Sequence, residues 1–270
     1  MPGKSTSFRS NVSAAFNDIV EGISKDWIWR AIAVEEVKLR YRGSVLGPLW
    51  LTITTVVMIV AMGVVFARVF NQDISKYMPY LTIGLVVWQF ISTLINEGCG
   101  VFLNAKSVIL QAPIPFTIYA CAMAYRNLII FAHSCVIIPL VLLFFAVPVG
   151  PDALWIAPAV FVLCLNGIWL SLLLGAISAR YRDVPPVIAS FVQVVFFITP
   201  IFWLPELLGD WKGIAELNPM FAAIDVIRAP LLGVPLAPNS WVVLLTTTFL
   251  GSLVTFAAFS CYRSRISYWL

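Results

Sequence analysis

Three cations stand on alternate residues, Lys38, Arg40 and Arg42, just before a long uncharged run of the chain. Arginine binds phosphate oxygens through two parallel hydrogen bonds, and lysine binds them as a point charge. The spacing therefore indicates one of two roles at the depth of lipid head groups. The cluster either recognises a phosphorylated lipid head or supplies the positive charge that anchors membrane proteins at their cytosolic surface.

The sequence gives little support for catalysis or metal binding. His133 is the only histidine, and its near neighbours offer no strongly polar side chain. A histidine that acts as a general base needs a polar partner to orient it. We therefore expect a packing or hydrogen-bonding role for His133, although a membrane acyltransferase would use a histidine in this position. The sequence contains no HExxH, CxxC pair or GxSxG motif, so we expect no catalytic residue and no metal site. It also contains no Walker A motif, so any ATP hydrolysis is expected on a separate chain.

Two further charged sites lie within apolar sequence. Arg126 stands roughly 15 Å of helix beyond an expected helix start near Phe116. An ionisable residue at this depth marks a functional pathway, unless its side chain snorkels toward the head groups. Asp225 and Arg228 are three residues apart, so they can pair on one face of a helix. Such a pair is either a simple surface ion pair or part of a gate.

These residues are set in a chain that must use the bilayer as its solvent. Of its 270 residues, 61% are hydrophobic and 11% are charged, compared with about 25% charged residues in soluble domains. The mean hydropathy is +0.94. Uncharged windows of at least 18 residues, each long enough for a membrane-spanning helix, cover residues 43–67, 77–96, 107–125, 127–151, 153–179, 184–205 and 229–262.

We expect an all-α membrane protein with six spans from these seven windows. The window 107–125 contains two prolines, and as a separate span it would need a hairpin of only Arg126 and Asn127. Its first part is therefore expected to be a cytosolic loop and its second part to begin the third span. With six spans, thirteen Lys and Arg residues fall on the inner side and four on the outer side. This bias places both termini in the cytosol.

The region before the first span divides into two parts. Residues 1–25 are polar and lack the apolar segment of a signal peptide, so they predict a mobile cytosolic tail. Residues 26–42 predict a helix that ends at Gly43 and carries two thin apolar stripes on nearly opposite faces. Such an amphipathic helix suits a position between lipid and protein. Residues 43–270 then form the six-span domain.

The chain between the fifth and sixth spans is irregular. Its apolar pieces, 201–208 and 220–233, are each too short to cross about 30 Å of hydrocarbon. Asn218 and Pro219 form a good helix start, with Asn as the N-cap and Pro at the first helical position. We expect short re-entrant helices that face the outer side of the membrane.

Five ordered stretches of the sequence resemble one family. They are EEVKLRYRGSVLGPLWLTI, YLTIGLVVWQFISTLINEG, LQAPIPF, ARYRDV and LNPMFAAIDVIRAPLLG. In this order they are similar to the membrane subunit of ABC-2-type polysaccharide exporters, and above all to the O-antigen/lipopolysaccharide export permeases, whose relatives export capsule and teichoic acid. The resemblance covers nearly the whole chain from about residue 26.

The resemblance implies a transporter subunit rather than an enzyme. Two copies of the six-span chain would form a homodimeric channel in the bacterial cytoplasmic (inner) membrane. Two copies of a separate ATP-binding subunit would drive it, so that ATP and Mg²⁺ bind the partner and this chain carries no cofactor. The substrate would be a polysaccharide on an undecaprenyl pyrophosphate anchor, moved from the inner to the outer leaflet. No nucleic acid is implied.

The resemblance also assigns roles to particular segments. The helix over 26–42 corresponds to the interface helix, and Lys38, Arg40 and Arg42 would meet the lipid pyrophosphate there. Residues 101–111 correspond to the helix that couples to the ATPase, and residues 180–183 to a second cytosolic contact. The broken region 203–233 corresponds to the outer exit and contains the gate candidates Asp225 and Arg228. The ATPase-coupling candidates are Val101, Lys106, Gln111, Arg180, Arg182 and Asp183.

A glycan in transit has apolar C–H faces, which pack well on aromatic rings. The chain is 14% aromatic, and the candidates to line a glycan conduit are Trp50, Trp88, Phe90 and Trp169. Most aromatic residues of membrane proteins instead face lipid or lie in interfacial belts. The sequence leaves open which of these faces the pore.

Two other functions remain open at this stage. The first is a small-molecule or drug exporter of the same ABC-2 architecture, against which the cationic stretch before the first span argues. The second is a membrane acyltransferase, which depends on His133 alone. An ATPase encoded beside glycosyltransferases would favour the polysaccharide.

Overall fold

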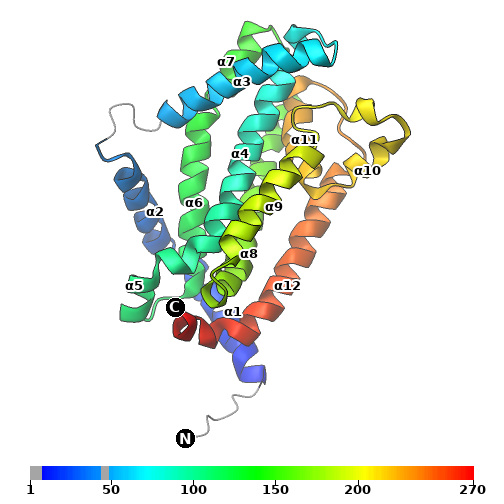
Figure 1. Cartoon of the computed structure of the whole chain (residues 1–270). Helices are drawn as coiled ribbons and strands as arrows, with labels where there is room; N and C mark the ends of the chain where they lie inside the picture. Colours follow the sequence, from blue (N-terminus) through cyan, green and yellow to red (C-terminus); the bar gives the residue numbers. More distant parts are fainter. Residues whose placement is uncertain (1–7, 44–48) are drawn as a thin grey trace, which may run out of the picture.

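The computed structural model describes residues 8–43 and 49–270, and within them every regular element is a helix. Figure 1 shows an elongated bundle in which α4, α6 and α8 run side by side. The elements in chain order are α1 (Phe8–Ser24), α2 (Asp26–Tyr41), α3 (Leu49–Val69), α4 (Ile74–Asn104), α5 (Lys106–Gln111), α6 (Phe116–Ser134), α7 (Ile137–Phe144), the 3₁₀ helix η1 (Pro151–Trp155), α8 (Ile156–Arg180), α9 (Val184–Ile198), the 3₁₀ helix η2 (Pro205–Trp211), α10 (Lys212–Glu216), α11 (Pro219–Leu232) and α12 (Ser240–Trp269).

The centre of the bundle is α4, which packs against α3, α6, α8, α9 and α11. Leu81, Ile83 and Val86 on this helix are fully buried. The contact between α4 and α8 is close, because a Cβ on Gly98 would lie only 3.2 Å from the Cα of Ser171. Small residues allow helix backbones to approach in this way inside membranes.

Among the described residues, five helical stretches are long and apolar enough to cross a bilayer: Thr52–Val69, Ile74–Gln111, Phe116–Phe144, Pro151–Arg180 and Ser240–Trp269. The fifth expected span, over the window 184–205, is shorter than expected and is not among these five stretches. Its helix, α9, has 15 residues, which corresponds to about 22 Å. It ends at Ile198 because Pro200 has no amide hydrogen to continue the helical bonds. The third span does begin at Phe116, as expected.

The prediction of a mobile tail over residues 1–25 is wrong for residues 8–24, which form α1. This helix packs against α6 and α12. Its inner face carries Ala15, Asp18 and Gly22, all buried, and a Cβ on Gly22 would lie 2.6 Å from the Cβ of Thr117. Residues 1–7 lie outside the described part of the chain.

Two predicted helix boundaries are confirmed. The helix expected over 26–42 is α2, and Gly43 beyond it has a φ of +81°, which glycine adopts without strain. The side chain of Asn218 accepts a hydrogen bond from the backbone N–H of Met220, with Pro219 in the first helical turn. The helix that follows, α11, ends at Gly233 in the left-handed conformation.

The bundle has two distinct ends. In Figure 1, α1, α5 and the end of α12 lie at the lower end, whereas α7, α10 and the start of α12 lie toward the upper end. The expected short helices between the fifth and sixth spans are η2, α10 and α11, and they belong to the upper part.

Candidate functional site: a charged cluster beside a polar cavity

Glu97 of α4 joins three helices through its two carboxylate oxygens. Its Oε1 accepts a hydrogen bond from Arg40 Nη2 of α2 at 2.6 Å. Its Oε2 accepts from Arg126 Nη2 at 2.6 Å and from Asn127 Nδ2 at 2.9 Å, both on α6. Arg126 also forms an ion pair with Glu36 of α2. We call Glu36, Arg40, Glu97 and Arg126 the charged cluster.

The charged cluster contains two positive and two negative side chains and is therefore neutral overall. Arg126 and Glu97 are largely buried, with 14% and 22% of their side chains exposed, whereas Arg40 is 37% exposed. Arg126 forms ion pairs with two carboxylates, those of Glu36 and Glu97. It is therefore not an unpaired charge inside the membrane, and its side chain does not simply snorkel to the head groups. Removing one partner of a buried pair typically costs about 3–5 kcal/mol. The buried pair of Arg126 and Glu97 therefore fixes α6 against α4, whereas Glu36 and Arg40, which are 41% and 37% exposed, attach α2 more weakly.

Sequence reasoning missed Glu97 and Glu36. Glu97 is the first charged residue after the uncharged window 77–96. A signal was present, because Glu97 and Arg126 are opposite charges placed toward the same membrane side in the expected topology. The pairing itself depends on how α4 and α6 pack, which the spacing along the chain does not fix.

A polar cavity of about 240 Å³ adjoins the charged cluster between α4 and α6. Gln89, Thr93 and Glu97 line it from α4 at intervals of four residues, so they share one helix face. On the other side, α6 contributes Asn127 and Ser134. Gln89 lies eight residues from Glu97, or about 12 Å along the helix. The cavity therefore extends polar groups from Glu97 into the apolar bundle; Arg40, Val86, Phe90, Ile130 and Phe131 complete its lining.

The three cations at alternate positions, Lys38, Arg40 and Arg42, have different surroundings. Arg40 is drawn onto Glu97, as described above. Lys38 pairs with Glu35 on its own helix at 3.3 Å, and both side chains are exposed. Arg42 is exposed just beyond the end of α2. Only Arg40 therefore connects the cationic stretch to the polar cavity.

The segments expected to contact an ATPase lie at one end of the molecule. α5 and the turn that joins α8 to α9 are both at the lower end (Figure 1). Lys106 and Gln111 are exposed on α5, where no residue is buried. Val101 differs, because it is buried inside α4 against Gly175. It therefore supports the packing of α4 on α8 and presents no surface to a partner.

The turn after α8 is exposed at Arg180, Arg182 and Asp183. The guanidinium of Arg180 lies 5.0 Å from the ring centre of Tyr181 and 5.4 Å from that of Trp269 at the end of α12. These contacts connect the turn to the C-terminal helix. A partner that binds here would contact both.

At the upper end, Asp225 and Arg228 are both buried, and each binds partners other than its neighbour. Asp225 accepts hydrogen bonds from Ser240 Oγ at 2.6 Å and from the backbone N–H of Ala237 at 3.1 Å. Arg228 Nη1 donates to the carbonyl of Pro200 at 3.0 Å. No ion pair joins Asp225 to Arg228 among the contacts of the described residues. The two side chains instead fasten the irregular segments on either side of α11.

Arg228, Tyr80 and Tyr77 all donate hydrogen bonds to the carbonyls that follow α9, and we call these three residues the upper clasp. The guanidinium of Arg228 lies 3.9 Å from the ring centre of Tyr80. The hydroxyl of Tyr80 lies 3.2 and 3.0 Å from the carbonyl oxygens of Pro200 and Trp203 and shares its one hydrogen between them, and the hydroxyl of Tyr77 donates to the carbonyl of Phe202. Buried carbonyls outside a helix need such donors. The clasp borders a cavity of about 740 Å³, which is lined in part by charged and aromatic side chains of α4, η2, α10 and α11.

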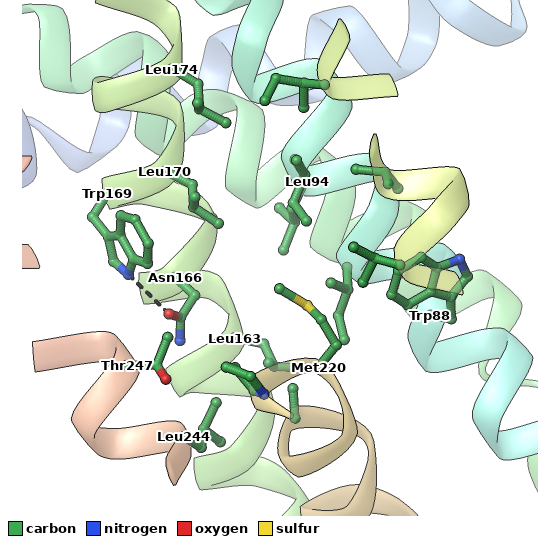
Figure 2. A pocket seen from close by; sticks show the side chains of 18 of the residues that line it. Trp88, Leu94, Leu163, Asn166, Trp169, Leu170, Leu174, Met220, Leu244 and Thr247 are labelled. Carbon is green, nitrogen blue, oxygen red and sulfur yellow. Dashed lines mark hydrogen bonds between the residues drawn. The ribbon is translucent and has the colours of Figure 1, made fainter. Parts of the chain in front are cut away.

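The four aromatic residues expected to line a conduit lie in three different places. Trp50 is exposed on α3. Phe90 stacks on Phe131, with ring centres 4.4 Å apart, beside the polar cavity. Trp88 and Trp169 line another cavity of about 240 Å³, and Figure 2 shows them on opposite sides of it.

The cavity between Trp88 and Trp169 is apolar, with leucine and methionine side chains between the two tryptophans (Figure 2). Asn166 and Thr247 are the polar side chains in its lining. The amide of Asn166 is already used, since it accepts from Trp169 Nε1 at 2.9 Å and donates to Thr248 Oγ1 at 2.8 Å. A hydrocarbon chain suits such a cavity better than a sugar does.

His133 has no catalytic surroundings in the described structure. Its side chain is exposed on α6, and Nδ1 lies 2.7 Å from the carbonyl oxygen of Ile129 on the preceding turn. This contact is a hydrogen bond within one helix, as expected from the sequence. It offers neither an acid nor a nucleophile for an acyl transfer.

Comparison with known proteins identifies the family of this chain. The profile of the ABC-2 type transporter family matches residues 29–232, and the chain therefore belongs to this family. It is 24% identical over 206 residues to the O-antigen export system permease protein RfbA of Myxococcus xanthus, an alignment that covers 74% of this chain and 78% of the relative. A protein of the same name from Klebsiella pneumoniae is 20% identical over 241 residues, or 87% of this chain and 92% of the relative.

Proposed function

We propose that this chain is the membrane-spanning permease subunit of an ATP-driven exporter of lipid-linked polysaccharide. Membership of the ABC-2 family and the names of the relatives support export of an O-antigen type of glycan. The observation that carries the proposal is the charged cluster, with an exposed arginine, beside a polar cavity in an otherwise apolar bundle. An apolar solute would need neither the charges nor the polar lining.

The proposed substrate is a polysaccharide on an undecaprenyl pyrophosphate anchor, and the lower end faces the cytosol of a bacterial inner membrane. Lys38, Arg40 and Arg42 stand where such an anionic head group would meet the protein. The glycan would leave past the upper clasp and the short helices η2, α10 and α11. Asp225 and Arg228 would then control the exit by holding the segments that border the large upper cavity.

The proposed assembly has two copies of this chain and two copies of a separate ATPase that binds ATP and Mg²⁺. In this assembly the chain itself carries no cofactor and catalyses no reaction. The exposed apolar side chains of Val108 and Leu110 on α5 favour a docked partner at the lower end. Arg180, Arg182 and Asp183 would extend the same contact.

The double substitution Arg40→Gln and Arg42→Gln tests the proposed head-group role. Both side chains become neutral but keep hydrogen-bonding ends, so export of surface glycan should fall by at least tenfold while the ATPase still co-purifies. The control is Arg30→Gln, because Arg30 is exposed on the same helix and pairs with Asp26. Unchanged export in the double variant, at normal amounts of membrane protein, would contradict the proposal.

A small-molecule exporter is the second candidate, and the apolar cavity beside Trp88 and Trp169 favours it. The two functions differ in what stimulates the ATPase of the reconstituted complex. Polyprenyl diphosphate sugars should stimulate it if the first proposal is right, and hydrophobic drugs should not. The reverse result would favour the second candidate.

A further inference from the structure

We propose that the polar cavity is the binding site for the diphosphate–sugar head group, and that Arg40 reaches it by exchanging Glu97 for a phosphate oxygen. This inference rests on the proposed function and adds to it a defined site with an internal competitor. Glu97 occupies the place of the substrate anion until the substrate arrives.

The two oxygens of Glu97 have separate partners. Arg40 binds Oε1, whereas Arg126 and Asn127 both bind Oε2. If Arg40 leaves, Glu97 still keeps two donors and its charge remains compensated by Arg126. Arg126 in turn also keeps Glu36. Loss of the contact with Arg40 therefore leaves no unpaired charge at the buried side of the cluster.

Arg40 is the member of the charged cluster that can exchange partners. Its side chain is 37% exposed, compared with 14% for Arg126. A phosphate group offers the same paired oxygens as a carboxylate, with more negative charge. The neutral cluster gives a diphosphate little net attraction while Glu97 holds Arg40. When Arg40 exchanges Glu97 for a phosphate, its positive charge becomes available to the ligand. This exchange takes place only when a competing anion is present.

The remaining lining suits a sugar beside the diphosphate. Gln89 Oε1 already accepts from Thr55, and Thr93 donates to the carbonyl of Gln89. Asn127 Nδ2 donates to Glu97 and to the carbonyl of Met123. The Gln89 amide nitrogen, the Thr93 and Ser134 hydroxyl oxygens and Asn127 Oδ1 remain as partners for a ligand in this space of about 240 Å³. Sugar hydroxyls both donate and accept hydrogen bonds, as these groups do. The space is below the roughly 300–1,000 Å³ of drug-sized sites. It therefore holds one sugar next to the head group, not a long glycan.

The exchange also changes how α2 is fastened. Arg40 is in the last turn of α2, whereas Glu36 and Trp29 hold earlier turns through Arg126 and Tyr125. Substrate binding should free the last turn while these two contacts keep the rest of α2 in place. The chain would thereby report an occupied head-group site through the end of this helix.

The test uses the full chain, with its co-purifying ATPase, in lipid nanodiscs. The probes are a labelled polyprenyl diphosphate that carries one sugar, the same lipid without sugar, and the neutral polyprenol. Glu97→Gln removes the internal competitor and should bind both diphosphate lipids severalfold to tenfold more tightly. Gln89→Leu should weaken binding of the sugar-bearing lipid alone. Glu21→Gln is the control, since Glu21 is exposed on α1 and pairs with Lys25, and neither residue lines the cavity.

Hydrogen exchange supplies a second measurement in case Glu97→Gln loosens the bundle. Adding the diphosphate lipid to the unsubstituted protein should speed exchange in residues 38–43 and leave residues 26–36 protected. Equal or weaker binding by Glu97→Gln, with residues 26–36 still protected, would overturn the inference, as would an unchanged sugar preference in Gln89→Leu. If the unsubstituted protein binds no diphosphate lipid at all, the proposed function itself fails.

Discussion

Asp18 of α1 and Arg263 of α12 are 245 residues apart in the chain, and Arg263 Nε donates a hydrogen bond of 2.7 Å to Asp18 Oδ2. The same carboxylate accepts from the backbone N–H groups of Phe116 and Thr117, at 3.2 and 3.0 Å, where α6 begins. These N–H groups have no partner inside their own helix, and a negative charge there is favourable. One buried side chain thus joins three helices at the lower end.

We expect Asp18→Asn to detach α1 from the bundle. The change removes the charge that Arg263 and the start of α6 share, and loss of one member of a buried ion pair costs roughly 3–5 kcal/mol. The melting temperature of the detergent-purified protein should fall by several degrees, and hydrogen exchange in residues 8–24 should rise. Glu21→Gln is the matched control, since Glu21 is exposed on the same helix. Equal melting temperatures of the two variants would contradict this role of Asp18.

The upper clasp should act as one cooperative unit. Tyr80→Phe removes the donor to two carbonyls, and Arg228→Lys removes the planar group that stacks on the ring. Each change should lower stability by about 1–3 kcal/mol. Because the two side chains touch each other and share the carbonyl of Pro200, a double-mutant cycle should give a coupling of about 0.5–3 kcal/mol. Simple additivity would mean that the two contacts are independent.

α5 should be required for partner binding. Leu110 is 55% exposed on this short helix, so Leu110→Glu places a charge in the proposed contact without disturbing the core. The ATPase should no longer co-purify, although the amount of permease in the membrane stays the same. Leu207→Glu is the control, because Leu207 is equally exposed, at 53%, on η2 in the upper part of the bundle. If the ATPase still co-purifies with Leu110→Glu, the contact lies elsewhere.

His133→Ala separates the transporter from an acyltransferase. The side chain is exposed and contacts only the carbonyl of Ile129 within the described structure. Glycan export should therefore remain within about twofold of normal, since the loss of one exposed hydrogen bond has a small effect. Export is measured as surface glycan per amount of membrane protein. Complete loss of activity, with normal protein amounts, would instead favour acyl transfer.

The sequence predicted the features that depend on local rules. The start of α11 followed from Asn218 and Pro219, and the end of α2 followed from Gly43, because both are set by backbone geometry at one or two residues. The family was confirmed over residues 29–232. Motifs of this kind retain their meaning without knowledge of the packing.

The features that failed depend on contacts between distant helices. α1 was missed although Phe16, Val20 and Ile23 recur at helical spacing on its exposed side. The face that packs on the bundle consists instead of Ala15, Asp18 and Gly22, which form no stripe of large apolar residues. The role of Glu97 was missed because its partner, Arg126, belongs to another helix. Uncharged windows in the sequence locate the membrane segments. They do not show which of the charged residues that flank different segments form ion pairs with each other.

α9 has a mechanical consequence for the surrounding membrane. With about 22 Å of helix against about 30 Å of hydrocarbon, the acyl chains next to its outward-facing residues Val187, Phe191 and Val194 must shorten or tilt to cover it. Such hydrophobic mismatch costs a fraction of a kcal/mol for each ångström. Bilayers of shorter-chain lipids should relieve this strain, so in the proposed exporter membrane thickness would tune how readily the lipid-linked substrate passes.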